Sequence, residues 1–144
     1  MEKRVLHLTI AVVSGMLAVV ISGCAANRVD IVDTGVVSLE QHTTGKVYIA
    51  WSSAYEDGDG FVVTGVLRRR DTVGTPIKAH VDIETLSPDG TVLDKSRSSD
   101  LYIPRRRVGR GQSLQRFKVR FANVPAEGSV VRITSHTGSH DNAT

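Results

Sequence analysis

Few residues in this chain of 144 stand in a pattern that supports catalysis. Cys24 is the single cysteine, so no intramolecular disulfide can form, and zinc sites that need two or more cysteines are excluded. No serine stands in the Gly-x-Ser-x-Gly context of a hydrolase nucleophile, and the sequence has no Gly-rich phosphate loop. We therefore predict a protein that is not an enzyme, with no catalytic residues and no cofactor; a hydrolase is the third hypothesis, which these observations disfavour.

Two short patterns resemble metal sites but favour simpler structures. His136 and His140 are four residues apart, which would suit a metal ion on a helix, but they lie in a polar segment that ends the chain and is expected to be disordered. The segment Glu56–Gly60 resembles part of a calcium loop, yet it is too short and is followed by an apolar strand, so a hairpin turn is expected. His42 and His80 have no neighbouring ligand set. The sequence thus predicts no metal site.

Two clusters of arginine are the strongest candidates for a binding patch. If both lie at one end of a β-sandwich, they would attract anionic lipid headgroups, lipopolysaccharide phosphates or an acidic protein. The alternative is two solvated loops whose arginines pair with Asp71 and Asp100. The first cluster consists of Arg68, Arg69 and Arg70, and the second of Arg105, Arg106, Arg107 and Arg110.

The overall charge is too small to indicate nucleic-acid binding. The formal net charge is +3, and loss of Glu2, Lys3 and Arg4 with a leader would leave 16 basic and 14 acidic residues. Nucleic-acid binding would need a concentrated basic face. We therefore expect a membrane and a protein, rather than a nucleic acid, as partners.

The first 23 residues have the composition of a secretory signal peptide. A short charged start, Met1–Arg4, precedes a largely apolar stretch, Val5–Ile21, and small residues follow. The alternative is an uncleaved transmembrane helix, for which the apolar stretch has a borderline length and contains His7 and Thr9.

The sequence Ile21-Ser22-Gly23-Cys24 resembles the lipobox of bacterial lipoproteins. The resemblance implies that signal peptidase recognises Ile21, Ser22 and Gly23, and that Cys24 receives a diacylglycerol before cleavage and an acyl chain such as palmitate afterwards. Two or more acyl chains anchor a protein stably. In the enterobacterial lipoproteins that this segment resembles, Asp after the cysteine retains the protein at the inner membrane. Since Ala25 stands at this position, the resemblance implies an outer-membrane anchor facing the periplasm.

Beyond a lipidated tether expected at residues 24–34, apolar and polar residues alternate as they do in half-buried β-strands. The first strand should place Val47, Ile49 and Trp51 on one face. An Asp-Gly turn within the segment Glu56–Gly60 should connect it to a strand with Phe61, Val63, Gly65 and Leu67 on one face and Val62, Thr64 and Val66 on the other.

Four further strands are expected. In residues 77–85, Ile77, Ala79, Val81 and Ile83 should point inward, and Lys78, His80, Asp82 and Glu84 outward. A type I turn at Ser87–Gly90 then leads to a returning strand. Phe117, Val119 and Phe121 should point inward from the next strand, with Arg116, Lys118 and Arg120 outside. The last strand should run from about Val130 to Thr134.

These patterns predict an all-β fold, an antiparallel sandwich of about seven strands at residues 35–135, followed by a disordered tail at 136–144. The motif order resembles the small immunoglobulin-like domains of bacterial envelope proteins of the FxLYD type. The matching segments are Phe61–Leu67, Ser87–Leu93, Leu101–Pro104, Gly111–Ser113 and Phe117–Phe121; Arg68–Arg70 stand where the family has an Asn.

The resemblance implies a binding or scaffold module with no catalytic residues. We expect a non-enzymatic, lipid-anchored adaptor or accessory module that binds another envelope protein by a sheet face or an edge strand. The alternative is a module that binds an anionic envelope lipid or glycan through the arginine-rich loops.

Overall fold

The computed structural model describes residues 28–71, 74–104 and 113–138, which contain strands and turns but no helix. All-β structure is thus confirmed, with eight strands in place of about seven. The strands are β1 (Val37–Thr43), β2 (Val47–Asp57), β3 (Gly60–Arg69), β4 (Ile77–Leu86), β5 (Val92–Arg97), β6 (Leu101–Ile103), β7 (Leu114–Phe121) and β8 (Ser129–Thr137).

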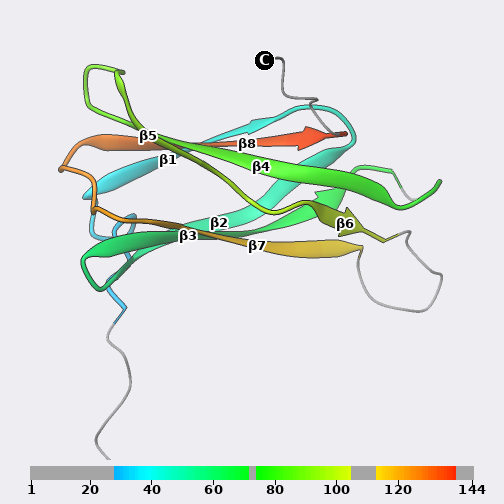
Figure 1. Ribbon diagram of the computed structural model, residues 1–144, viewed down its shortest axis with the longest axis horizontal. Coiled ribbons are helices and arrows are strands. Elements are labelled where there is room, and N and C mark those ends of the chain that lie inside the picture. Colours follow the sequence, from blue (N-terminus) through cyan, green and yellow to red (C-terminus); the bar gives the residue numbers. More distant parts are fainter. Residues whose placement is uncertain (1–27, 72–73, 105–112, 139–144) are drawn as a thin grey trace, which may run out of the picture.

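The strands form two sheets that lie one above the other (Figure 1). One sheet has three strands in the order β2-β3-β7. The other has five, in the order β1-β8-β4-β5, with β6 pairing the part of β4 that β5 leaves open. The pairing is antiparallel except that β1 runs parallel to β8, so the expectation of a purely antiparallel sandwich is wrong at this edge. After β1 the chain crosses to the other sheet and returns only later as β8, and this long connection lets β1 and β8 run in the same direction.

The core between the sheets is built mostly from aliphatic residues. Val63 and Leu67 of β3 face Val81 and Ile83 of β4, and all four are fully buried. Phe61 and Phe121 stack across β3 and β7 with ring centroids 4.7 Å apart. Because inward residues recur every second position on both sheets, each sheet buries one face and leaves the other near solvent.

The predicted turns connect the strands as expected. β2 and β3 form an antiparallel hairpin whose turn residues are Gly58 and Asp59, between the paired residues Asp57 and Gly60, and Gly58 has a positive φ of 67°. The turn after β4 closes with a hydrogen bond of 2.9 Å from the Gly90 amide to the Ser87 carbonyl. The inward positions of Phe117, Val119 and Phe121 are also confirmed, since all three are buried.

A β-bulge in β2 overturns the predicted position of Trp51. The register of β2 against β3 shifts between Ile49 and Trp51, so Ala50 is the extra residue. A bulge moves every later side chain to the opposite face. Ile49 stays in the core, whereas Trp51 is 55% exposed on the outside.

Both ends of the folded domain extend beyond the expected bounds of 35–135. Ile31 is fully buried and its amide bonds the Ala54 carbonyl at 3.0 Å, so the tether does not reach residue 34. At the other end β8 includes His136 and Thr137, and the Gly138 amide bonds the Lys78 carbonyl. Sequence reasoning placed these residues in a tail because polar residues dominate there, but the outer face of a sheet accepts polar side chains.

Candidate functional site

The outer face of the three-stranded sheet gathers aromatic and basic side chains. Register places Trp51 beside Val66 and Val66 beside Arg116, and in the next row Ser53 lies beside Thr64 and Thr64 beside Lys118. We call this surface the basic aromatic face and define it by Arg28, Trp51, Tyr55, Arg116 and Lys118.

An open depression of about 770 Å³ lies on this face. Ligand pockets commonly have volumes of about 300–1,000 Å³. Arg28, Arg116 and Lys118 at its lining are exposed, and Asp30 is the single acidic residue among the described residues that line it. The depression is therefore wide, accessible and biased toward anionic ligands.

The N-terminal segment contributes one wall of the depression and is fixed to β2. Oδ1 of Asp30 accepts hydrogen bonds from the amides of Val32 and Asp33, and Oδ2 accepts one of 2.5 Å from the Ser53 hydroxyl. Burial raises the pKa of the Asp30 carboxyl, but these hydrogen bonds outweigh it and leave the pKa below its usual value. Asp30 thus remains an anion that serves the fold.

Arg28 lies over the Tyr55 ring, with its guanidinium carbon 4.9 Å from the ring centroid. A cation–π contact of this kind holds a charged group over an aromatic surface without neutralising it. The guanidinium therefore stays available at the edge of the depression.

Gly65 shapes the middle of the same sheet. A Cβ at this position would lie 2.5 Å from Cζ of Phe117 and 2.6 Å from the Trp51 carbonyl oxygen. Only glycine allows the Phe117 ring and the bulged strand to approach β3 this closely. The bulge that exposes Trp51 therefore lies directly beside Gly65, the position at which only glycine fits.

The outer face of the five-stranded sheet has a different character, because charges of opposite sign alternate across it. Arg132 of β8 contacts Glu40 of β1 at 3.0 Å and Glu84 of β4 at 3.8 Å, and Lys95 of β5 contacts Glu84 at 2.9 Å. These ion pairs neutralise one another, so this part of the face presents little net charge to a ligand.

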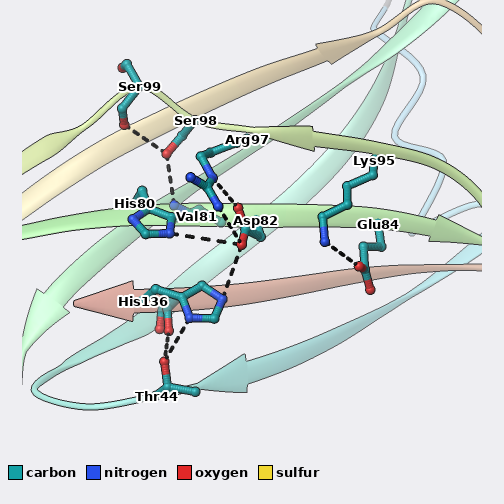
Figure 2. Close-up of polar contacts among 11 residues, drawn as sticks. Thr44, His80, Val81, Asp82, Glu84, Lys95, Arg97, Ser98, Ser99 and His136 are labelled. Atoms are coloured by element: carbon teal, nitrogen blue, oxygen red, sulfur yellow. Dashed lines mark hydrogen bonds and ion pairs between the residues drawn. The ribbon is translucent and has the colours of Figure 1, made fainter. Parts of the chain in front are cut away.

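One end of this face groups two histidines with an aspartate, as Figure 2 shows. Nε2 of His136 lies 3.4 Å from Oδ2 of Asp82, and Nε2 of His80 lies 4.0 Å from the same oxygen. The imidazole rings stack with centroids 5.2 Å apart. His80 points outward as predicted from the alternation, but it is 2% exposed and not solvated.

Arg97 holds the other oxygen of that aspartate. Its Nε donates to Oδ1 of Asp82 at 2.7 Å. Burial raises the pKa of the Asp82 carboxyl, but the Arg97 hydrogen bond and charge, with smaller contributions from His80 and His136, bring the pKa below its usual value. Asp82 is therefore an anion between cationic or polar neighbours.

The predicted arginine patch is only partly visible. Arg68 and Arg69 belong to strand β3 and not to a loop. The Arg69 side chain is 2% exposed and donates to Asp71 at 2.8 Å and to the Thr75 carbonyl at 2.9 Å. Arg69 therefore cannot contact a ligand in this conformation. Arg70 is exposed and lies over Tyr48.

The remaining predicted residues fall outside the described ranges or have ordinary contacts. Asp100, expected as an arginine partner, bonds Lys78 at 2.8 Å. Asp57 of the calcium-like segment pairs with Arg120, and His42 pairs with Glu40. The residues that lie outside the described ranges are Ile21, Ser22, Gly23, Cys24, Arg105, Arg106, Arg107, Arg110 and His140.

Searches against protein-family models, curated proteins and solved structures find no match. Within the described ranges no helix is long and apolar enough to cross a bilayer.

Sequence reasoning missed both groupings of candidate side chains. The basic aromatic face depends on the bulge at Ala50, for which the sequence has no glycine or proline signal. The spacing His80-x-Asp82 is visible in the sequence and places both side chains on one face of a strand. Their partner, His136, comes from β8 and is identified only by register, which pairs it directly with His80.

Proposed function

We propose that this chain is a non-enzymatic, lipid-anchored module of the bacterial envelope that binds an acidic partner protein through the basic aromatic face. The observation that carries the proposal is Trp51, which is 55% exposed and lines the same depression as Arg28, Arg116 and Lys118. Trp, Tyr and Arg are the residues that most often dominate protein interfaces.

The anchor in this proposal is a lipid on Cys24, with Ile21, Ser22 and Gly23 as the peptidase recognition sequence. The leader is removed, and the protein is held at the outer membrane, facing the periplasm. Anchoring leaves the domain at the surface where other envelope proteins meet it.

The fold in this proposal is an immunoglobulin-like sandwich of the FxLYD type. The pairing of β3 with β7 is equivalent to that of strands B and E in an immunoglobulin domain, and the pairing of β4 with β8 to that of strands C and F. The parallel strand β1 takes the place that strand G has beside strand F. Such domains serve mostly in binding, which supports the absence of catalysis in the proposal.

Site-specific photocrosslinking in intact cells tests the partner. A photoreactive amino acid replaces Trp51 or Tyr55 on the face, and Tyr102, which is 63% exposed on β6 of the other sheet, as the matched control. We expect the same protein adduct from positions 51 and 55, none from position 102, and loss of the adduct when Arg116 is changed to Glu. Equal adducts from position 102, or no protein adduct from the face, would contradict the proposal.

The alternative function, binding of an anionic lipid or glycan, is favoured by the short chain between Cys24 and Arg28. Four residues span at most about 14 Å, so an anchored Cys24 would hold the depression close to lipid headgroups.

Liposome flotation separates the two functions. The chain from Ala25 onward is mixed with neutral vesicles or with vesicles that contain an anionic phospholipid, at low and at physiological salt. The protein-partner proposal predicts no flotation at physiological salt. Flotation with anionic vesicles alone, which weakens as the salt concentration rises and which Arg116→Gln abolishes, would support lipid binding by the face. Loss with Arg105, Arg106 and Arg107 changed to Ser would instead assign it to the arginine loop.

A further inference from the structure

Three side chains from two paired strands converge on the outer face of the five-stranded sheet. His80 and Asp82 are alternate residues of β4, and His136 of β8 is the register partner of His80. Their ligand-type atoms all lie within 4.8 Å of one another. We propose that His80, Asp82 and His136 bind a divalent transition-metal ion such as Zn²⁺. The site lies on the opposite sheet from the basic aromatic face, and it stands whether or not that face binds a partner.

The distances fit this coordination after a small adjustment. Ligand atoms about 2.1 Å from a tetrahedral zinc ion are separated by about 3.4 Å from one another. Nε2 of His136 is already 3.4 Å from Oδ2 of Asp82, and Nε2 of His80 is 4.0 Å from that oxygen. The nitrogens of His80 and His136 lie within 4.8 Å of each other, so rotations of the two rings that bring these atoms closer by up to about 1.4 Å would complete the three-ligand set.

Arg97 contacts both oxygens of Asp82, one closely and one at the limit of a hydrogen bond. Its Nε donates to Oδ1 at 2.7 Å and its Nη2 to Oδ2 at 3.5 Å, and Oδ2 also faces both imidazoles (Figure 2). Metal-binding carboxylates are commonly oriented in this way by a donor on their second oxygen. Arg97 thus fixes which oxygen faces the ion.

Thr44 sets the orientation of the His136 ring. The Thr44 hydroxyl donates its proton to the Ser135 carbonyl at 2.6 Å, so it acts as the acceptor toward Nδ1 of His136, 3.4 Å away. Nδ1 then carries a proton, which leaves Nε2 as the nitrogen that faces the Asp82 carboxylate. In the proposed site a metal ion would lie between this nitrogen and Oδ2 of Asp82.

Metal binding would have to open the stack of the two imidazole rings, because a histidine holds a metal ion in the plane of its ring. The planes of His80 and His136 differ by 18°, and His80 is almost completely buried. The side chains of Asp82 and His136 keep 14% and 22% exposure, so an ion would reach the site from solvent and retain an open coordination position. Two imidazole nitrogens and one carboxylate oxygen select zinc, nickel or copper over calcium and magnesium.

Metal titration of the full chain in detergent tests the proposal. The protein is first stripped with a chelator, and Zn²⁺ binding is then measured by equilibrium dialysis, with Co²⁺ as a spectroscopic substitute. We expect one ion per chain and the visible bands of tetrahedral cobalt. His136→Asn and Asp82→Asn should each weaken binding by about tenfold or more.

The matched control is His42→Asn on the same sheet face. The His42 side chain is 48% exposed and pairs with Glu40, away from the cluster. We expect this variant to bind zinc as the original chain does, and all variants to keep the circular dichroism spectrum of a β-protein. His80→Asn is a weaker test because its buried position makes unfolding a second cause of loss.

Three results would overturn the proposal. The first is the absence of saturable binding of Zn²⁺ or Co²⁺. The second is an equal loss of binding in the His42 and His136 variants. The third is an NMR spectrum in which Nε2 of His136 keeps a proton at saturating Zn²⁺. That proton would show that the cation between His136 and Asp82 is the imidazolium itself.

Discussion

At the scale of residues, Asp30 shows how one side chain fixes the start of the domain. Its carboxylate receives the amides of Val32 and Asp33 and the hydroxyl of Ser53, which closes the turn before β1 and ties it to β2. Hydrogen bonds to a charged acceptor are stronger than bonds between neutral groups. The charge of Asp30 should therefore contribute to stability in a way that depends on pH.

Asp30→Asn should lower the free energy of unfolding by about 1–2 kcal/mol at pH 7. Because the folded pKa of Asp30 lies below its unfolded value, the advantage of the original chain is complete above the unfolded pKa of about 3.9. It should shrink as pH falls through the lower folded pKa, where the carboxylate becomes protonated. Urea unfolding of both proteins at pH 7 and at pH 3 checks this, and an undiminished difference at pH 3 would contradict it.

Gly65→Ala should destabilise the three-stranded sheet, because the new methyl group meets the Phe117 ring and the Trp51 carbonyl. Overpacking of this kind costs about 1–3 kcal/mol. The neighbouring Thr64→Ala, on the outer face, is the matched control and should change the free energy of unfolding by less than about 0.5 kcal/mol. Chemical denaturation followed by tryptophan fluorescence measures both, and a neutral Gly65 variant would show that β3 and β7 do not approach so closely.

At the scale of elements, strict alternation along the sequence predicted the strands and most inward faces correctly. It held for β4 and β7, where Val81, Ile83 and Phe117 are buried as expected. It did not identify the bulge in β2, and it did not predict that Val62 on the outer side of β3 would be fully buried. Alternation of apolar and polar residues reveals the local period of one strand. Bulges, and the burial of side chains on an outer face, depend on the neighbouring strands and are therefore not predicted by it.

The pairing of β1 with β8 was also beyond sequence reasoning. Parallel strands need a long connection, and Val37 and Ser129 are far apart in the chain. For the same reason only half of the histidine–aspartate cluster can be read from the sequence. The spacing of His80 and Asp82 is visible there, whereas their contact with His136 depends on the pairing of β4 with β8.

Arg69 at the end of β3 provides a prediction at this scale. Its buried guanidinium joins the strand to the following turn through Asp71 and the Thr75 carbonyl. Arg69→Lys keeps the charge but loses the planar set of donors, so we expect a loss of about 1–3 kcal/mol of stability. Arg70→Lys, at the adjacent exposed position, is the control. Equal melting temperatures for the two variants would contradict the structural role of Arg69.

At the scale of the whole molecule, the folded domain begins closer to Cys24 than the sequence indicated. Ile31 is fully buried and Val29 accepts a hydrogen bond from the Glu56 amide, so only a few residues separate the proposed lipid from the sandwich. Figure 1 shows the described chain entering beside the three-stranded sheet, the sheet that carries the basic aromatic face. An anchor at Cys24 would thus restrict which surfaces of the domain a partner can reach.

Ile31→Ala should release this segment from β2. Loss of a fully buried aliphatic side chain costs about 2–4 kcal/mol. Limited proteolysis should then cut the chain between Cys24 and β1 faster, whereas Val29→Ala, at an exposed position, should leave the rate unchanged. Equal cleavage rates in the two variants would show that the segment is not held by its buried isoleucine.

The most direct test of the central claim, a module anchored by lipid on Cys24, is metabolic labelling of the full chain with an alkyne analogue of palmitate. The account predicts label on the original protein in the membrane fraction and none on Cys24→Ser. A Cys24→Ser chain that is cleaved, labelled and retained in the membrane, or an original chain that takes up no label, would contradict it.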